Sequence, residues 1–164
     1  YHSIEPGRYE AFANRFNINN KNFPKIQKYF HEIALDDNNG EKTFYYSPKG
    51  ANSSLLKPSN YDCTYRVKAF TFDYFLEVEN LINKKIKLLK LEAEGLEPEI
   101  LKGASKTLAN IEYIAADLGP ERGIKEECTL AQVSSIMFDN GFKMINFEFP
   151  RITAIFKNTK YLKN

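Results

Sequence analysis

The spacing of apolar and polar residues predicts a chain that alternates between strands and helices. The apolar run from 86 to 91 is too dense for a strand with one solvated face and too short for a helix, so we predict a strand buried on both faces. A helix is predicted directly after it, because Pro98 suits a first helical turn and an apolar stripe continues to Leu108. The rest of the chain is arranged around this strand, turn and helix.

Similar patterns predict the remaining elements. Apolar residues at helical spacing predict helices at 8–19 and 73–81, and a capping-box pattern of Thr129 and Gln132 opens another that ends at Asn140. Alternating or apolar runs predict strands at 1–6, 26–35, 41–47, 64–70, 111–117, 142–149 and 152–157. The strands at 41–47 and 64–70 either pair with each other or extend a sheet edge. The last two are separated by two residues only, which predicts an antiparallel hairpin.

The repeated strand-helix order predicts an α/β fold with a mostly parallel sheet and helices on both faces. With 164 residues and 43% hydrophobic content, the chain is long enough for one core, and no second domain is expected. The net charge of +2 comes from basic and acidic residues spread along the chain, so no surface for a nucleic-acid backbone is predicted. No run is apolar enough to span a membrane, and no signal-peptide pattern is present.

The cysteines and histidines predict no metal site. Cys63 and Cys128 lie far apart without a C-x-x-C partner, and only His2 and His31 are available to complete a zinc set. Packing or surface positions are expected for both histidines. Reduced cysteines and the absence of a targeting pattern favour a cytoplasmic protein.

Carboxylates concentrate where the central strand gives way to its helix. Glu92, Glu94 and Glu97 share a stretch of eight residues with Lys90. In an open parallel sheet, ligands bind outside the carboxyl ends of the strands, which is where these side chains are expected. A solvated loop with a helix-capping acid gives the same pattern, so the position alone leaves both interpretations open.

The residue order in this unit resembles the signature of the FkbM family of S-adenosylmethionine-dependent methyltransferases. The matching run is Lys90-Leu91-Glu92-Ala93-Glu94-Gly95-Leu96-Glu97, followed by Ile-Leu-Lys-Gly-Ala at 100–104. The family usually has Asp where this chain has Glu92, which keeps the charge but lengthens the arm. Shorter matches follow the family order at Ile4-Glu5-Pro6, Ala34-Leu35, Gly40-Glu41, Phe44 and Thr71-Phe72-Asp73. The resemblance covers nearly the whole chain and implies a Rossmann-like class I methyltransferase sheet, mostly parallel with a C-terminal antiparallel hairpin.

The resemblance also implies a strand and a glycine-rich turn that hold the methionine end of the cofactor, and this sequence has no match for them. Residues 50–52 do not qualify, because no buried strand leads directly into a helix there. In the family strand order, the absent strand lies between the strand ending at Glu5 and the one ending near Glu92. Its loss would leave two buried edges unpaired. Residues 1–164 are therefore expected to be the C-terminal part of a single methyltransferase domain.

For function, the resemblance implies methyl transfer from S-adenosylmethionine to an oxygen of a small molecule or glycan. Glu5, with Pro6 beside it, is placed at a strand end to accept hydrogen bonds from the ribose hydroxyls. Glu32 and Ala34 are expected near the adenine. The alternative for Glu5 is a helix N-terminal acid without a ligand.

The same resemblance implies three candidate catalytic residues. Glu92 and Glu94 are expected near the point of methyl transfer, where a carboxylate orients or deprotonates an acceptor hydroxyl, although an ion pair with Lys90 explains them equally well. Asp117 ends the next strand and either binds the acceptor or is solvated.

Two other classes of protein remain open. An acid at the end of the second strand also binds the ribose of a nicotinamide cofactor, so an NAD-type oxidoreductase is the alternative enzyme, although the closing hairpin disfavours its usually parallel sheet. A non-catalytic interaction domain derived from the enzyme is the third possibility. The sequence does not indicate an oligomeric state.

Overall fold

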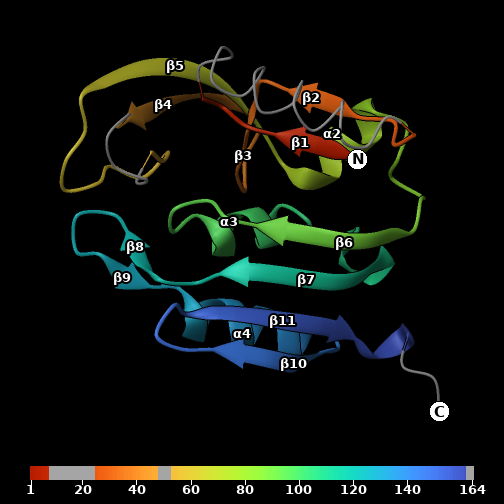
Figure 1. Cartoon of the computed structure of the whole chain (residues 1–164). Coiled ribbons are helices and arrows are strands. Elements are labelled where there is room, and N and C mark those ends of the chain that lie inside the picture. Colours follow the sequence, from red (N-terminus) through yellow and green to blue (C-terminus); the bar gives the residue numbers. More distant parts are fainter. Residues whose placement is uncertain (8–24, 48–52, 162–164) are drawn as a thin grey trace.

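The computed structural model describes residues 1–7, 25–47 and 53–161. The helix predicted at 8–19 and the loop at 50–52 lie outside these ranges. The α/β class is confirmed: the described chain contains both strands and helices, and both contribute to one hydrophobic core (Figure 1).

The C-terminal half is built on a four-stranded sheet in the order β10-β11-β7-β6. The central strands β6 (Ile86–Leu91) and β7 (Ile111–Asp117) are parallel, whereas β11 (Thr153–Asn158) is antiparallel to both β7 and β10 (Phe142–Glu148). The predicted C-terminal hairpin is therefore confirmed. Helix α4 (Leu130–Asp139) packs on β10 and on α3 (Glu97–Lys102).

The N-terminal half contains two smaller sheets. Strand β1 (His2–Ile4) pairs in parallel with β2 (Tyr29–His31). Strand β5 (Cys63–Phe70) lies between β3 (Ala34–Leu35), which is parallel to it, and β4 (Gly40–Tyr46), which is antiparallel. The strands expected at 41–47 and 64–70 thus pair with each other. The single strand expected at 26–35 is divided into β2 and β3, because the chain changes its pairing partner from β1 to β5 within it.

The sheet arrangement is more mixed than the sequence predicted. The described strands form both parallel and antiparallel pairs. A single mostly parallel sheet is not evident, because β1 and β6 belong to separate sheets. Figure 1 nevertheless shows β1, β6 and β7 pointing in the same direction. The part of the chain that the structure describes leaves β1 paired with β2 only and β6 paired with β7 only.

The prediction that β6 is buried on both faces is wrong. Its end at Leu91 is buried, but Leu88 is 55% exposed and the side chains of Lys87 and Lys90 reach solvent. The reason is that β6 is the last strand of its sheet, so solvent reaches its side chains around the edge that no described strand covers.

Helix boundaries follow the predicted pattern, with two differences. Helix α2 (Phe72–Val78) is capped by the hydroxyl of Thr71, which accepts a hydrogen bond from the Tyr74 amide at 3.1 Å. Helix α3 ends at Lys102, and the chain continues through turns to the short 3₁₀ helix η1 (Leu108–Asn110). Thr129 precedes α4, but its hydroxyl makes no capping bond, so the capping-box prediction is wrong.

A small hairpin of β8 (Pro120–Arg122) and β9 (Glu127–Cys128) follows β7 and was not predicted. The short 3₁₀ helix η2 (Thr159–Tyr161) ends the described chain. Within the described ranges, no helix combines the length and the apolar character needed to cross a bilayer.

Candidate functional site

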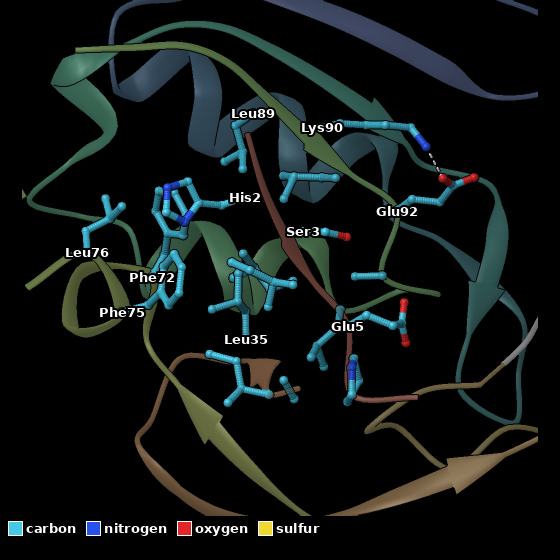
Figure 2. Close-up of a pocket in the computed structure, with 18 of the residues that line it drawn as sticks. His2, Ser3, Glu5, Leu35, Phe72, Phe75, Leu76, Leu89, Lys90 and Glu92 are labelled. Atoms are coloured by element: carbon cyan, nitrogen blue, oxygen red, sulfur yellow. Dashed lines mark hydrogen bonds and ion pairs between the residues drawn. The ribbon is translucent and has the colours of Figure 1, made fainter. Parts of the chain in front are cut away.

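A cavity of about 1010 Å³ lies between the parallel strands β1 and β6. Residues 1–6 line one side, residues 84–93 line the other, and α2 contributes Phe72, Phe75 and Leu76. Figure 2 shows Glu5 and Glu92 at the end of the cavity where the two strands finish, and His2 toward the opposite end. The carboxyl ends of two parallel strands therefore open into one space, as in α/β proteins that bind nucleotides there.

Glu5 directly follows β1 and faces this cavity. Its backbone amide donates to the carbonyl of His31 at 3.0 Å, which fixes its position relative to β2. One carboxylate oxygen accepts a hydrogen bond from the Gly7 amide at 2.9 Å. Burial raises the pKa of Glu5, and the Gly7 hydrogen bond offsets part of this rise. Among the described residues, no basic side chain forms an ion pair with Glu5.

The other three predicted cofactor residues occupy different positions. Pro6 lines the cavity beside Glu5, and its carbonyl accepts a hydrogen bond from the Tyr65 hydroxyl at 3.2 Å. Ala34 is buried at the start of β3 and also lines the cavity. Glu32 is exposed and is not among the lining residues. The structure thus brings Glu5, Pro6 and Ala34 to one cavity and places Glu32 outside it.

Glu92 follows β6 and lines the same cavity, but basic side chains already contact it. It forms ion pairs with Lys90 and with Arg151, whose Nη2 lies 2.9 Å from Oε1. The hydrogen bond from Lys90 lowers the pKa of Glu92, and Arg151 lowers it further. Glu92 is therefore held in its charged form.

Asp117 is buried at the end of β7, next to the same arginine. Arg151 donates from Nε to Oδ2 of Asp117 at 2.8 Å and also bonds this oxygen through Nη2. One guanidinium therefore joins the carboxylates at the ends of β6 and β7. The sequence showed Arg151 only as a residue between two closing strands, and nothing in its local pattern indicated these partners.

Glu94 has the most unusual environment of the predicted acids. Its backbone is left-handed, with φ of 51°, and its Oε2 atom is buried without a hydrogen-bond partner among the described residues. The pKa of Glu94 is raised to about 8, first by burial and then by the charge of the neighbouring Glu121. The protonated form of Glu94 is therefore the major one at neutral pH.

Glu121 is a potential functional residue that the sequence did not reveal. It lies in β8, four residues beyond Asp117, and burial and the Asp117 charge raise its pKa. Its position just past the end of β7 could have marked Glu121 as a candidate, but the hairpin that carries it was not predicted. Glu94, Glu121 and Asp117 do not line the large cavity and lie beyond its end at Glu92 and Ala93.

Glu97 is buried but serves the turn itself. One oxygen accepts hydrogen bonds from the amides of Ala93 at 2.9 Å and Gly95 at 3.3 Å, and the other accepts one from the Thr129 hydroxyl at 3.1 Å. This bond accounts for the missing cap on α4. Glu97 therefore fixes the shape of the turn that carries Glu94.

The hairpin is tied to the same turn by Arg122. Its guanidinium forms a two-point ion pair with Glu99 at 2.8 and 2.7 Å and also donates to the carbonyl of Gly95. Gly95 has a φ of 91°, and a Cβ built on it would lie 2.4 Å from Cα of Arg122. Only glycine fits this contact between the turn and the hairpin.

Comparison with known proteins identifies similar sequences and folds. The family model described as "Methyltransferase FkbM domain" matches residues 1–161. The crystal structure of methyltransferase FkbM from Methylobacillus flagellatus KT matches with a TM-score of 0.54 and 15% sequence identity, over 95% of this chain and 36% of that chain. The chain thus spans about a third of the length of this structure, and at this identity the likeness is one of fold. No match was found among curated proteins.

Proposed function

This chain belongs to the FkbM methyltransferase family, and on that premise we propose that it takes part in transferring a methyl group from S-adenosylmethionine to an oxygen of a small molecule or glycan. Bound S-adenosylmethionine supplies an electrophilic methyl group on its sulfonium centre. The residues of this chain have to hold the nucleoside, orient the acceptor and receive its proton.

The environment of Glu5 is the single observation that carries the cofactor proposal. Its carboxylate faces the cavity at a strand end, is desolvated, and has one amide donor but no ion pair with a described residue. A carboxylate in this condition gains from further donors, and two ribose hydroxyls supply them. Pro6 and Ala34 line the same cavity with apolar surface suited to the adjacent base.

We assign the proton-accepting role to Glu94 in its deprotonated form. A general base is most effective when its pKa lies near the working pH, and the pKa of Glu94 is about 8, so this form is the minor one at pH 7 and becomes the major one above pH 8. Glu121 is the neighbouring carboxyl group whose charge contributes to the raised pKa of Glu94. Glu92 and Asp117 are bound by Arg151, so their role is to orient an acceptor rather than to take its proton.

We also propose that one further parallel strand lies between β1 and β6, as the family resemblance implies. The described edges of β1 and β6 that face each other carry no partner, the two strands point the same way, and the cavity separates them (Figure 1). A strand in this place would join β2-β1 and β6-β7 into one mostly parallel sheet. It would also cover the exposed side of β6.

Calorimetric titration tests the cofactor proposal. The full-length natural protein is expected to bind S-adenosylmethionine one to one and to release no comparable heat with NAD⁺. The reverse preference would contradict the proposal and favour a dinucleotide-dependent oxidoreductase. If the protein binds neither S-adenosylmethionine nor NAD⁺, the result would favour a non-catalytic interaction domain.

The same titration on residues 1–164 alone tests the additional strand. Weak or undetectable binding of S-adenosylmethionine is expected, because the cofactor would lose one wall of its site. Tight, saturable one-to-one binding by this chain would show that the gap between β1 and β6 is not filled by a strand.

A further inference from the structure

Two histidines and one glutamate meet at the end of the cavity away from Glu5. In the parallel pairing of β1 and β2, His2 lies opposite Tyr29, so His2 and His31 fall on the same face of this two-stranded sheet. Glu79 is the residue that caps the C-terminal end of α2, and its carboxylate lies near His31. Three elements that are far apart in sequence therefore bring their side chains to one point.

The distances suit a shared ligand. His2 Nδ1 lies 3.0 Å from His31 Nε2, which makes these two nitrogens the facing pair, whereas Glu79 Oε1 lies 3.6 Å from the other ring nitrogen of His31, Nδ1. One candidate ligand atom from each of the three residues lies within 4.8 Å of the other two. Metal-nitrogen bonds of about 2.0–2.1 Å in a tetrahedral zinc site put two imidazole nitrogens about 3.4 Å apart, so the histidines need to separate by only about 0.4 Å.

Aromatic side chains hold both imidazoles in place. Tyr29 stacks on His2 with ring centroids 4.7 Å apart, and the edge of Phe75 meets His31 at 4.8 Å and His2 at 6.2 Å. The His31 side chain is 14% exposed, whereas that of Glu79 is 30% exposed and free to adjust. Rings fixed before binding lower the entropic cost of forming a site.

Without a cation, a hydrogen bond from the ring N–H of one neutral imidazole to the bare nitrogen of the other accounts for the short contact. With the donor ring in its other tautomer, both facing nitrogens present lone pairs. A bound cation would satisfy both lone pairs at once, and the nearby carboxylate of Glu79 would balance its charge.

We propose that His2, His31 and Glu79 bind a divalent transition-metal ion of the zinc type, each through one atom. Imidazole ligands favour zinc, cobalt or nickel over magnesium and calcium, which prefer oxygen ligands. Because His2 lines the cavity, a fourth position on the metal would open toward that space. Figure 2 shows His2 beside Phe72 and Phe75 at this end of the cavity. The separation of these residues along the chain is why the sequence predicted no metal site.

Metal titration of the full-length protein, purified without a histidine tag and treated with a chelator, tests this site. One equivalent of zinc chloride is expected to bind with saturable heat, and one equivalent of cobalt(II) is expected to give the visible absorption of a tetrahedral centre. His31→Gln and His2→Gln are each expected to weaken zinc binding at least tenfold. Glu77→Gln, which changes an exposed acid on the same helix, is the matched control and should bind as the parent does.

The remaining outcomes each decide the question. No zinc binding by the parent, or binding unchanged in His31→Gln and His2→Gln, would overturn the site. If a histidine variant loses its native circular dichroism without metal, Glu79→Gln decides instead, because its side chain is partly exposed and supports little of the core. Weaker zinc binding by Glu79→Gln than by Glu77→Gln supports the site, and equal binding overturns it. The inference does not depend on methyltransferase activity.

Discussion

The turn after β6 and the cavity beside β1 both contain acidic side chains, but these acids have different numbers of hydrogen-bond and ion-pair partners in the two regions. In the turn, Glu97 has three donors and Glu99 has a two-point ion pair with Arg122. At the cavity, Glu5 has one amide donor and no ion pair among the described residues. A buried acid whose partners are complete stabilises the fold, whereas one with few partners retains the capacity to bind a ligand.

Both kinds of acid occur within four residues of the turn, because Glu94 has few partners and Glu97 has a full set. It lies on the turn that Glu97 holds rigid, yet its own carboxyl group faces other acids rather than a cation. A rigid backbone under a poorly compensated side chain is the usual arrangement of a catalytic group. The comparison therefore predicts different consequences for removing the two kinds of acid.

The largest effect is expected from Glu94→Gln in the full-length enzyme. If Glu94 receives the acceptor proton, turnover should fall by about 100- to 10,000-fold with little change in melting temperature. The rate of S-adenosylhomocysteine formation with a methyl acceptor measures this. Glu99→Gln is the contrasting variant: losing its pair with Arg122 should lower the melting temperature and leave turnover within a few-fold. Unchanged turnover in Glu94→Gln, with a lower melting temperature, would assign Glu94 to the structural group.

Glu97→Ala should produce the largest loss of stability. The substitution leaves two amides and the Thr129 hydroxyl without their acceptor, at about 1 kcal/mol or more each, so the free energy of unfolding should fall by roughly 3 kcal/mol. Urea unfolding followed by circular dichroism measures the change. Glu97→Gln keeps one acceptor oxygen and should lose less. An unaltered urea midpoint for Glu97→Ala would mean that these hydrogen bonds are replaced by water.

Glu5→Ala should weaken cofactor binding without affecting folding. If Glu5 accepts two charge-assisted hydrogen bonds from the ribose, the substitution removes both, so affinity for S-adenosylmethionine should fall at least tenfold, equivalent to about 1.4 kcal/mol. Glu5→Gln should be milder, because the amide oxygen still accepts a bond. Calorimetric titration of the full-length protein measures both, with Glu77→Ala as an exposed control. If Glu5→Ala binds S-adenosylmethionine as tightly as the parent, Glu5 does not bind the ribose and is only a charged residue at a strand end.

The last prediction concerns stability against pH. The pKa of Glu94 is raised to about 8 in the folded protein, so between its unfolded value near 4.5 and pH 8 the folded state holds a proton that the unfolded state has lost. Stability should therefore decrease as pH rises from about 5 to 8 and level off above 8. Glu94→Gln should flatten this decrease in urea midpoints measured across the range. An equally steep decrease in the variant would place its origin elsewhere.

Local sequence pattern predicted much of the element order but not the contacts that define the site. Strands β4, β5 and β7 and helix α4 lie close to their predicted ranges, because their apolar periodicity is determined by the faces they bury. Thr129 matched a capping box, but its hydroxyl bonds Glu97, which is 32 residues away. A tertiary partner replaced the local one.

The site residues show the same limit. The positions of Glu5 and Ala34 at the cavity agree with the strand-end rule, since that rule concerns sheet geometry that a sequence pattern encodes. Arg151 and Glu121 were missed because their importance comes from neighbours brought together by folding. The prediction for β6 failed at Leu88, because an apolar run in the sequence does not reveal whether another strand covers the edge of the strand that it forms.

The contact between Gly95 and Arg122 offers a way to adjust the distance between Glu94 and Glu121. Any side chain at 95 would press on the backbone of Arg122, and Glu121 is the adjacent residue in that hairpin. Gly95→Ala would therefore act as a wedge, displacing the hairpin and moving Glu121 relative to Glu94 without altering either acid. Because glycine has no side chain, the backbones of the turn and the hairpin touch directly, and the separation of Glu94 and Glu121 is the one that this contact permits.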